Sequence, residues 1–217
     1  MAPLQPGILA RGPWQTDQVA TRWREDRFEP HAGAHAAADE AIAQLRDRGS
    51  PSHDGLGARL ASYESSPQGL ELELQPVRWS LRLGDDAAAS LSALCVTRDG
   101  DGRWLAGRRA AWLATWAGRW ALGAGGSVEM GENPTQTLAR ELHEEWSVEP
   151  ERLSVEALVR IPSGLVLLVG LATLAPGAEV VPDAEHDEYA WWPADVSAWP
   201  DEADEPLRRM ASLLAAG

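Results

Sequence analysis

Residues 123–148 read GAGGSVEMGENPTQTLARELHEEWSV and carry the clearest local signals in the chain. Asn133 is a good helix N-cap, Pro134 suits the first helical position, and Gln136 can complete a capping box. Glycines precede these residues, and Leu138 and Leu142 share one helical face. The sequence therefore predicts an amphipathic helix that follows a glycine-rich loop.

Three carboxylates lie on another face of this predicted helix. Glu141, Glu144 and Glu145 stand at positions i, i+3 and i+4, which places them side by side. Like charges at this spacing repel one another, so the cluster favours a bound cation. Carboxylate oxygens select hard ions, of which Mg²⁺ fits best with phosphate substrates and Mn²⁺ can substitute. For such a cluster taken alone, the alternative is a solvated acidic helix face.

The wider pattern of this stretch resembles the box motif of the Nudix hydrolase family. That motif is Gly, five residues, Glu, seven residues, then Arg-Glu-aliphatic-any-Glu-Glu-any-Gly-aliphatic. A chance match is expected about once in ten million windows at average residue usage. Ser147 is the one departure, because the family has glycine there. The matching residues are Gly126, Glu132, Arg140, Glu141, Leu142, Glu144, Glu145 and Val148.

The resemblance covers about residues 88–200 and implies both a fold and a reaction. The fold is α/β, with an α/β/α sandwich around a mixed sheet. The reaction is cleavage of the diphosphate linkage of a nucleoside diphosphate derivative, helped by Mg²⁺ that neutralises the diphosphate and activates a water. Pro162 and the stretch RLASYESSPQGLELEL at 59–74 resemble features of ADP-ribose and UDP-sugar hydrolases. A nucleotide sugar or ADP-ribose is therefore favoured over a nucleoside triphosphate.

The resemblance also implies roles within the motif. The three helix carboxylates would be catalytic metal ligands, and a backbone carbonyl at Gly125 or Gly126 would add another ligand. Glu132 and Arg140 would pair and fix the loop against the helix, so they are structural, as is Gly126. The general base would be either a box glutamate or a carboxylate from a distant loop.

Candidate residues outside the motif are less specific. Glu185 and Glu188 are the distant candidates for the base or a further metal ligand, with an ordinary solvated loop as the alternative. His186 between them is expected at the surface or behind the metal ligands. Tryptophans before the motif could stack on a base, or pack in the core, and arginines could bind phosphates. The candidates for substrate contact are Trp112, Trp116, Arg108, Arg109 and Arg119.

The composition narrows the classes of partner. A net charge of -14 argues against binding to nucleic acid or to an anionic membrane, because both need a basic face. The longest apolar run, 165–175, is too short to span a bilayer and predicts a buried strand. Cys95 is the one cysteine, and the N-terminus lacks the pattern of a signal peptide, so a cytoplasmic location is expected.

The chain is expected to divide into an N-terminal α+β extension, 1–86, and a Nudix domain, 87–217. The extension is expected to cap the cleft or to form a homodimer interface. Two alternatives are less favoured. A Nudix module that binds a nucleotide without cleaving it usually loses box carboxylates, which this sequence keeps, and an isomerase on the same fold would need a Cys and a Glu in places where they are not evident. Helices are expected at 17–24, 36–48, 134–146 and 205–215, a hairpin at 70–74 and 77–83, and strands at 155–161, 165–174 and 188–192.

Overall fold

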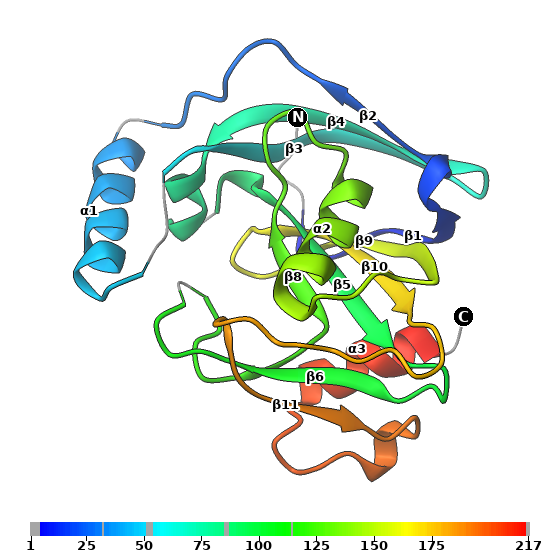
Figure 1. The fold of residues 1–217 in the computed structure, drawn as a ribbon. Helices are drawn as coiled ribbons and strands as arrows, with labels where there is room; N and C mark the ends of the chain where they lie inside the picture. The colour runs from blue at the N-terminus through cyan, green and yellow to red at the C-terminus, as the bar shows by residue number, and fades with distance from the viewer. Residues whose placement is uncertain (1–4, 32, 51–53, 85–86, 114, 216–217) are drawn as a thin grey trace.

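The computed structural model describes residues 5–31, 33–50, 54–84, 87–113 and 115–215. Within these residues the largest element is an eight-stranded mixed sheet (Figure 1). β10 and β5 pair in parallel, and β7 (Trp120–Leu122) and β8 (Ala124–Ser127) pair with β6 and β5. The remaining strand order is β1 (Gly7–Gln15), β9 (Arg152–Arg160), β10 (Val166–Thr173), β5 (Leu91–Arg98), β6 (Trp104–Arg109) and β11 (His186–Trp192).

Two helices cover opposite faces of the main sheet (Figure 1). α2 (Pro134–Trp146) packs Leu138 and Leu142 into the core cluster that contains Cys95 of β5. α3 (Glu205–Ala215) packs Leu207 into a second cluster with Val96, the next residue of the same strand. Because successive side chains of a strand point to opposite faces, the two clusters lie on the two sides of the sheet. The predicted α/β/α sandwich around a mixed sheet is confirmed.

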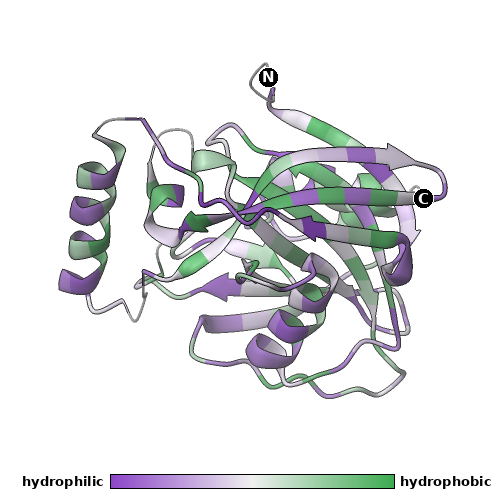
Figure 2. Ribbon diagram, turned by 90° about the horizontal axis from the view of Figure 1, so that it is seen from above, coloured by the Kyte–Doolittle hydropathy of each residue, from purple (hydrophilic) through white to green (hydrophobic). Residues whose placement is uncertain are grey.

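A smaller sheet lies on the side of the main sheet that α2 covers. Its order is β2 (Val19–Trp23), β4 (Gly69–Arg78) and β3 (Leu56–Ser66). Leu70, Leu72 and Leu74 of β4 are buried in the same core cluster as α2, while the residues between them face outward. Figure 2 shows this alternation of apolar and polar residues along the strands. The small sheet and α2 therefore share one core.

The predicted secondary structure of the extension is partly wrong. The predicted helix at 17–24 is a single 3-10 turn followed by β2. The predicted hairpin of 70–74 with 77–83 is wrong too, because β4 continues through Pro76 and pairs with β3. The Pro76 carbonyl accepts from Phe28 N at 2.9 Å, on the side where β2 has ended. A proline fits there because no strand needs its missing N–H.

Two further segments complete the extension. α1 (Ala34–Asp47) agrees with the predicted helix at 36–48. β1 pairs antiparallel with β9 at the edge of the main sheet, and Trp14 of β1 is buried in the core cluster of α2. The division at residue 86 stays a prediction about folding units. The main sheet itself crosses that boundary, because β1 is one of its strands.

The predicted cap of α2 is confirmed. The Asn133 side chain accepts from Thr135 N at 3.0 Å, and the Gln136 side chain accepts from Asn133 N at 3.0 Å. At the other end Ser147 adopts a left-handed conformation with φ 55°. No helix in the described ranges is long and apolar enough to cross a membrane.

Replacing Ser147 by glycine is expected to stabilise the protein. Glycine adopts the left-handed conformation without the strain of a side chain, so the free energy of unfolding should rise by about 1 kcal/mol. The melting temperature should then rise by about 2–4 °C. Thermal unfolding of S147G beside the original chain measures this. A lower melting temperature would show that contacts of the Ser147 side chain stabilise the protein by more than its backbone strain destabilises it.

Candidate active site

Glu145 lies at the bottom of the site, between α2 and the glycine-rich loop. Its side chain is buried, with 3% of the residue exposed, and its Oε1 accepts from Gly125 N at 2.8 Å. Its Oε2 has no hydrogen-bond partner among the described residues. Burial raises the pKa of Glu145 well above its ordinary value. A buried carboxylate oxygen without a partner is costly unless a cation or a proton joins it.

Arg140 connects three carboxylates of the motif. Its Nε lies 2.8 Å from Glu132 Oε1, and its Nη1 lies 2.8 Å from Glu141 Oε1 and 3.0 Å from Glu144 Oε2. Its Nη2 also donates to the Ser127 carbonyl at 3.3 Å. Burial alone would raise the pKa of Glu132, but the hydrogen bonds from Arg140 lower it below the ordinary value. The structure thus contains the Glu132–Arg140 pair that the family resemblance implies.

Glu141 lies directly beside the glycine-rich loop. Burial raises its pKa to about 7, although Arg140 opposes the shift. A Cβ atom at Gly126 would overlap the Glu141 carboxylate. The absence of a side chain at Gly126 therefore provides the space in which this carboxylate lies.

The donor atoms of this site fit a hard divalent cation. No arrangement of three or more His, Cys, Asp or Glu side chains poised to hold a metal occurs in the described part of the chain. The reason is visible in the ion pairs, because Glu141 and Glu144 are both turned toward Arg140, whose charge compensates them. The unpartnered Oε2 of Glu145 and the carboxylates of Glu141 and Glu144 are oxygen donors of the kind Mg²⁺ and Mn²⁺ prefer.

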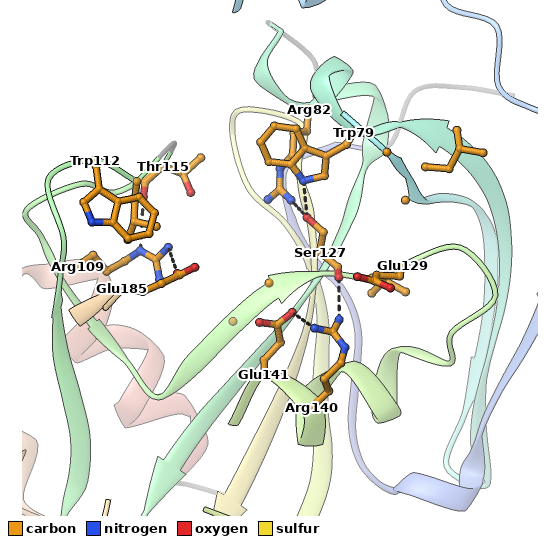
Figure 3. Close-up of a pocket in the computed structure, with 17 residues that line it drawn as sticks. Trp79, Arg82, Arg109, Trp112, Thr115, Ser127, Glu129, Arg140, Glu141 and Glu185 are labelled. Carbon is orange, nitrogen blue, oxygen red and sulfur yellow. Dashed lines mark hydrogen bonds and ion pairs between the residues drawn. The ribbon is translucent and has the colours of Figure 1, made fainter. Parts of the chain in front are cut away.

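A cleft of about 480 Å³ opens beside Glu141, and neither Glu144 nor Glu145 is among the described residues that line it (Figure 3). Its floor is the motif, including Gly125 to Glu129, Arg140 and Glu141. One side is formed by the loop after β6 together with Glu185. The other side comes from the extension, with Leu56 at the start of β3, and Trp79 and Arg82 of the 3-10 helix η2 (Trp79–Leu83). The cleft is thus built by both parts of the chain.

Three of the candidates outside the motif line this cleft. Trp112 and Arg109 belong to the loop side, and Arg109 Nη2 lies 3.5 Å from Glu185 Oε2. Burial raises the pKa of Glu185, with Arg109 opposing the shift. Figure 3 shows these three side chains grouped together on one side of the cleft.

Four candidates lie elsewhere, which corrects their expected location. Glu188 and Arg108 pair with each other at 3.3 Å on the surface, across neighbouring positions of β11 and β6. Arg119 pairs with Asp204, and Trp116 is 42% exposed. None of the four is among the residues that line the cleft in the described part of the chain. Each is turned away because its own strand or loop position faces solvent.

His186 is buried rather than exposed at the surface. Its Nε2 lies 3.6 Å from Glu145 Oε2, and its ring lies 4.3 Å from that of Trp146 between the two centroids. Burial lowers the pKa of His186, and Arg109 lowers it further. The alternative that places His186 behind Glu145 therefore agrees with the structure.

Two residues of the cleft, Trp79 and Arg82, were missed by the sequence reasoning. The alternation of apolar residues after Pro76 predicted a strand there, and no spacing connects η2 with the motif 45 residues later. Only the packing of the small sheet against the glycine-rich loop, through the bridge Gly57↔Glu129, brings them to the site.

The family model described as the NUDIX domain matches residues 89–214, which is more than half of the chain. The chain therefore belongs to the Nudix hydrolase family. No curated protein matches the sequence.

Solved structures with a similar fold include two Nudix proteins and an Ap4A hydrolase. The NUDIX domain of Shewanella oneidensis NrtR, complexed with ADP ribose, has 22% identity and a TM-score of 0.48, covering 58% of this chain and 86% of its own. A MutT NUDIX hydrolase from Burkholderia pseudomallei has 24% identity and a TM-score of 0.48, covering 58% and 97%. An Ap4A hydrolase from C. elegans has 21% identity and a TM-score of 0.45, covering 58% and 99%.

The raised pKa of Glu141 gives an expected pH dependence of stability. Its folded-state pKa of about 7 exceeds the ordinary 4.5, so between these values the folded protein binds a proton more tightly than the unfolded chain does. This contribution to stability is fully present below pH 4.5 and is lost as the pH rises through 7. Without metal, the free energy of unfolding should fall by about 3 kcal/mol from pH 5 to pH 8.

Urea unfolding at several pH values, in EDTA and in Mg²⁺, measures this. Mg²⁺ should stabilise the protein most at pH 8, where it faces ionised carboxylates, and E141Q should flatten the slope in EDTA. A metal-free protein whose stability rises from pH 5 to pH 8 would contradict the expectation.

Proposed function

We propose that this Nudix-type pyrophosphohydrolase cleaves the diphosphate linkage of a nucleoside diphosphate derivative, with a divalent cation held by Glu141, Glu144 and Glu145. The observation that carries the proposal is the buried, unpartnered Oε2 of Glu145 beside the partly buried carboxylate of Glu141. Glu141 lines the floor of the cleft and Glu145 lies buried next to it, and two such neighbouring carboxylates are expected where a hard cation binds. Mg²⁺ is the expected ion, and Mn²⁺ the expected substitute.

The bound ion would neutralise diphosphate charge and lower the pKa of a water in its coordination shell. The chain's own residues supply the rest. Arg140 orients Glu141 and Glu144, and the Gly125 N–H fixes Glu145 through Oε1. Gly126 leaves the space that lets the Glu141 carboxylate face the cleft.

Glu185 is our proposed general base, in place of Glu188. Glu185 lines the cleft, whereas Glu188 is held at the surface by Arg108. The raised pKa of Glu185 makes its carboxylate a better proton acceptor than an ordinary glutamate. In this scheme the water oxygen bonds to phosphorus while a Glu185 carboxylate oxygen takes the water's proton. The bond from phosphorus to the bridging oxygen breaks, and its electron pair stays on the leaving phosphate group.

The favoured substrates are a nucleotide sugar and ADP-ribose. A cleft of about 480 Å³ lies within the size range that binds ligands of this kind. One tryptophan lies on each side of the cleft, Trp79 and Trp112. Each offers a flat apolar surface on which a ring can stack, which suits a substrate with a ring at both ends. A nucleoside triphosphate has a ring at one end alone.

The test is turnover of a substrate panel by the full chain. Nucleotide sugars, ADP-ribose, dinucleoside polyphosphates and nucleoside triphosphates are incubated with Mg²⁺ or Mn²⁺, and phosphate is measured after phosphatase treatment. The proposal expects Mg²⁺-dependent release, with the highest kcat/KM for a nucleotide sugar or ADP-ribose. Tight binding of a nucleotide without turnover of any panel member would instead favour a non-catalytic Nudix module.

The cellular setting is also a proposal. We propose a cytoplasmic protein, since the free thiol of Cys95 is buried and needs no oxidising compartment. The homodimer expected of the extension stays a prediction. Size-exclusion chromatography with light scattering measures it.

A further inference from the structure

Arg82 is a cation of the extension that faces the cleft. It belongs to η2, which follows β4 directly, and its side chain is held between two serines of the Nudix domain. Its Nη2 donates to Ser92 Oγ at 3.0 Å, and its Nη1 donates to Ser127 Oγ. Among the described residues no carboxylate lies within ion-pair distance of Arg82. Neutral hydroxyls therefore orient the guanidinium, and no ion pair among the described residues neutralises its charge.

Arg109 brings a second guanidinium to the same cleft from the loop side. Its side chain is mostly buried, at 14% exposed, and its one ion pair among the described residues is the 3.5 Å contact with Glu185. Burial and the nearby charge of Arg109 together lower the pKa of Arg82 to about 10. Both arginines remain cations at neutral pH, so they repel each other across the cleft. An anion between them would remove that repulsion.

Trp79 and Ser127 place the Arg82 side chain relative to the catalytic motif. Trp79 Nε1 donates to Ser127 Oγ at 2.9 Å, and the Arg82 guanidinium lies 5.5 Å from the centre of the Trp79 ring. Ser127 immediately follows Gly126, whose lack of a side chain makes room for Glu141 (Figure 3). One hydroxyl thus accepts from two residues of the extension at the edge of the carboxylate site.

We propose that Arg82 is a substrate-binding residue, and that it and Arg109 bind the diphosphate oxygens of the substrate from the two sides of the cleft. The inference rests on the proposed function and extends it, because it makes the extension one wall of the active site. Guanidinium groups suit this role, since their planar N–H donors match phosphate oxygens in pairs. The proposed ligand class is a nucleoside diphosphate or its derivative.

Binding of ADP in EDTA, measured by titration calorimetry with the full chain, tests Arg82 without metal or turnover. Losing a charge-assisted pair should raise the dissociation constant of R82Q about ten- to a hundredfold. R82K keeps the charge but loses the paired geometry, so an intermediate increase is expected. Adenosine, which has no phosphate, should bind R82Q and the original chain equally.

A control variant separates substrate binding from a general effect of removing a charge from the extension. R22Q removes a surface arginine of the extension that pairs with Glu73. It should bind ADP within about twofold of the original chain, because this exposed ion pair lies away from the cleft and does not touch the ligand. Circular dichroism shows whether each variant is folded; if R82Q is not, R82K provides the same comparison.

The outcomes distinguish this inference from the proposed function. ADP binding by R82Q within twofold of the original chain overturns the role of Arg82, even if the substrate panel is cleaved. A large loss of ADP affinity in R82Q without turnover of any panel member supports the Arg82 site and overturns the proposed hydrolysis. No ADP binding by the original chain at millimolar concentration overturns the inference directly.

Discussion

Replacing Glu145 by glutamine is expected to lower kcat at least about a thousandfold while the protein stays folded. Glutamine keeps the shape of the side chain and an oxygen that can accept from Gly125 N. Glutamine lacks the negative charge that would bind the cation. Loss of this charge should raise the activation free energy by about 4 kcal/mol. In EDTA the variant should be at least as stable as the original chain, because it no longer buries an ionised carboxylate.

Steady-state kinetics at saturating Mg²⁺ and thermal unfolding in EDTA together measure this expectation. The matched control is Glu149→Gln, because Glu149 is exposed and pairs with His143 beyond the helix end. Turnover by the control should be unchanged. Turnover by E145Q within tenfold of the original chain would remove Glu145 from the proposed cation site.

Replacing Arg140 by methionine is expected to be the most destabilising of these changes. The Arg140 side chain is only 26% exposed. The substitution leaves the carboxylates of Glu132 and Glu141, which are 20% and 12% exposed, without their cationic partner. Removing one member of a largely buried ion-pair network lowers the free energy of unfolding by about 3 kcal/mol. For a chain of this size that corresponds to a fall of roughly 6–12 °C in melting temperature.

The fall in the melting temperature of R140M should be smaller in Mg²⁺ than in EDTA. A bound cation would compensate the charges of Glu141 and Glu144 when the guanidinium is gone. Thermal unfolding in both buffers measures the difference. Arg103→Met is the control, since Arg103 pairs with Asp99 but is 51% exposed, and an exposed pair contributes less than about 1 kcal/mol. Equal falls in melting temperature for R140M and R103M would mean that the ion pairs of Arg140 do not stabilise the fold.

Helix α2 could be predicted from sequence because its signals are local. Asn133, Pro134 and the spacing of the leucines fix where α2 begins and which face is buried. The same spacing puts Glu141 and Glu145 together whatever the rest of the chain does. Likewise the apolar run at 165–174 has the length and composition of a buried strand, and β10 is one.

The rest of the site depends on contacts between distant segments, which periodicity does not encode. Trp79 and Arg82 reach the cleft through a sheet that packs on the glycine-rich loop. Glu185 and Glu188 have the same residue type and lie three positions apart, so no pattern separates them. Glu185 precedes β11 and lines the cleft, whereas Glu188 lies within β11 and pairs with Arg108 at the surface.

The edge strand β1 has a consequence for synthesis on the ribosome. Gly7–Gln15 pairs with Arg152–Arg160, so well over a hundred residues must be made before its partner exists. At about 5–20 residues per second that interval is of the order of ten seconds. Until then Trp14 has no completed core to enter. The main sheet is therefore completed late, by a strand that is made long before its partner.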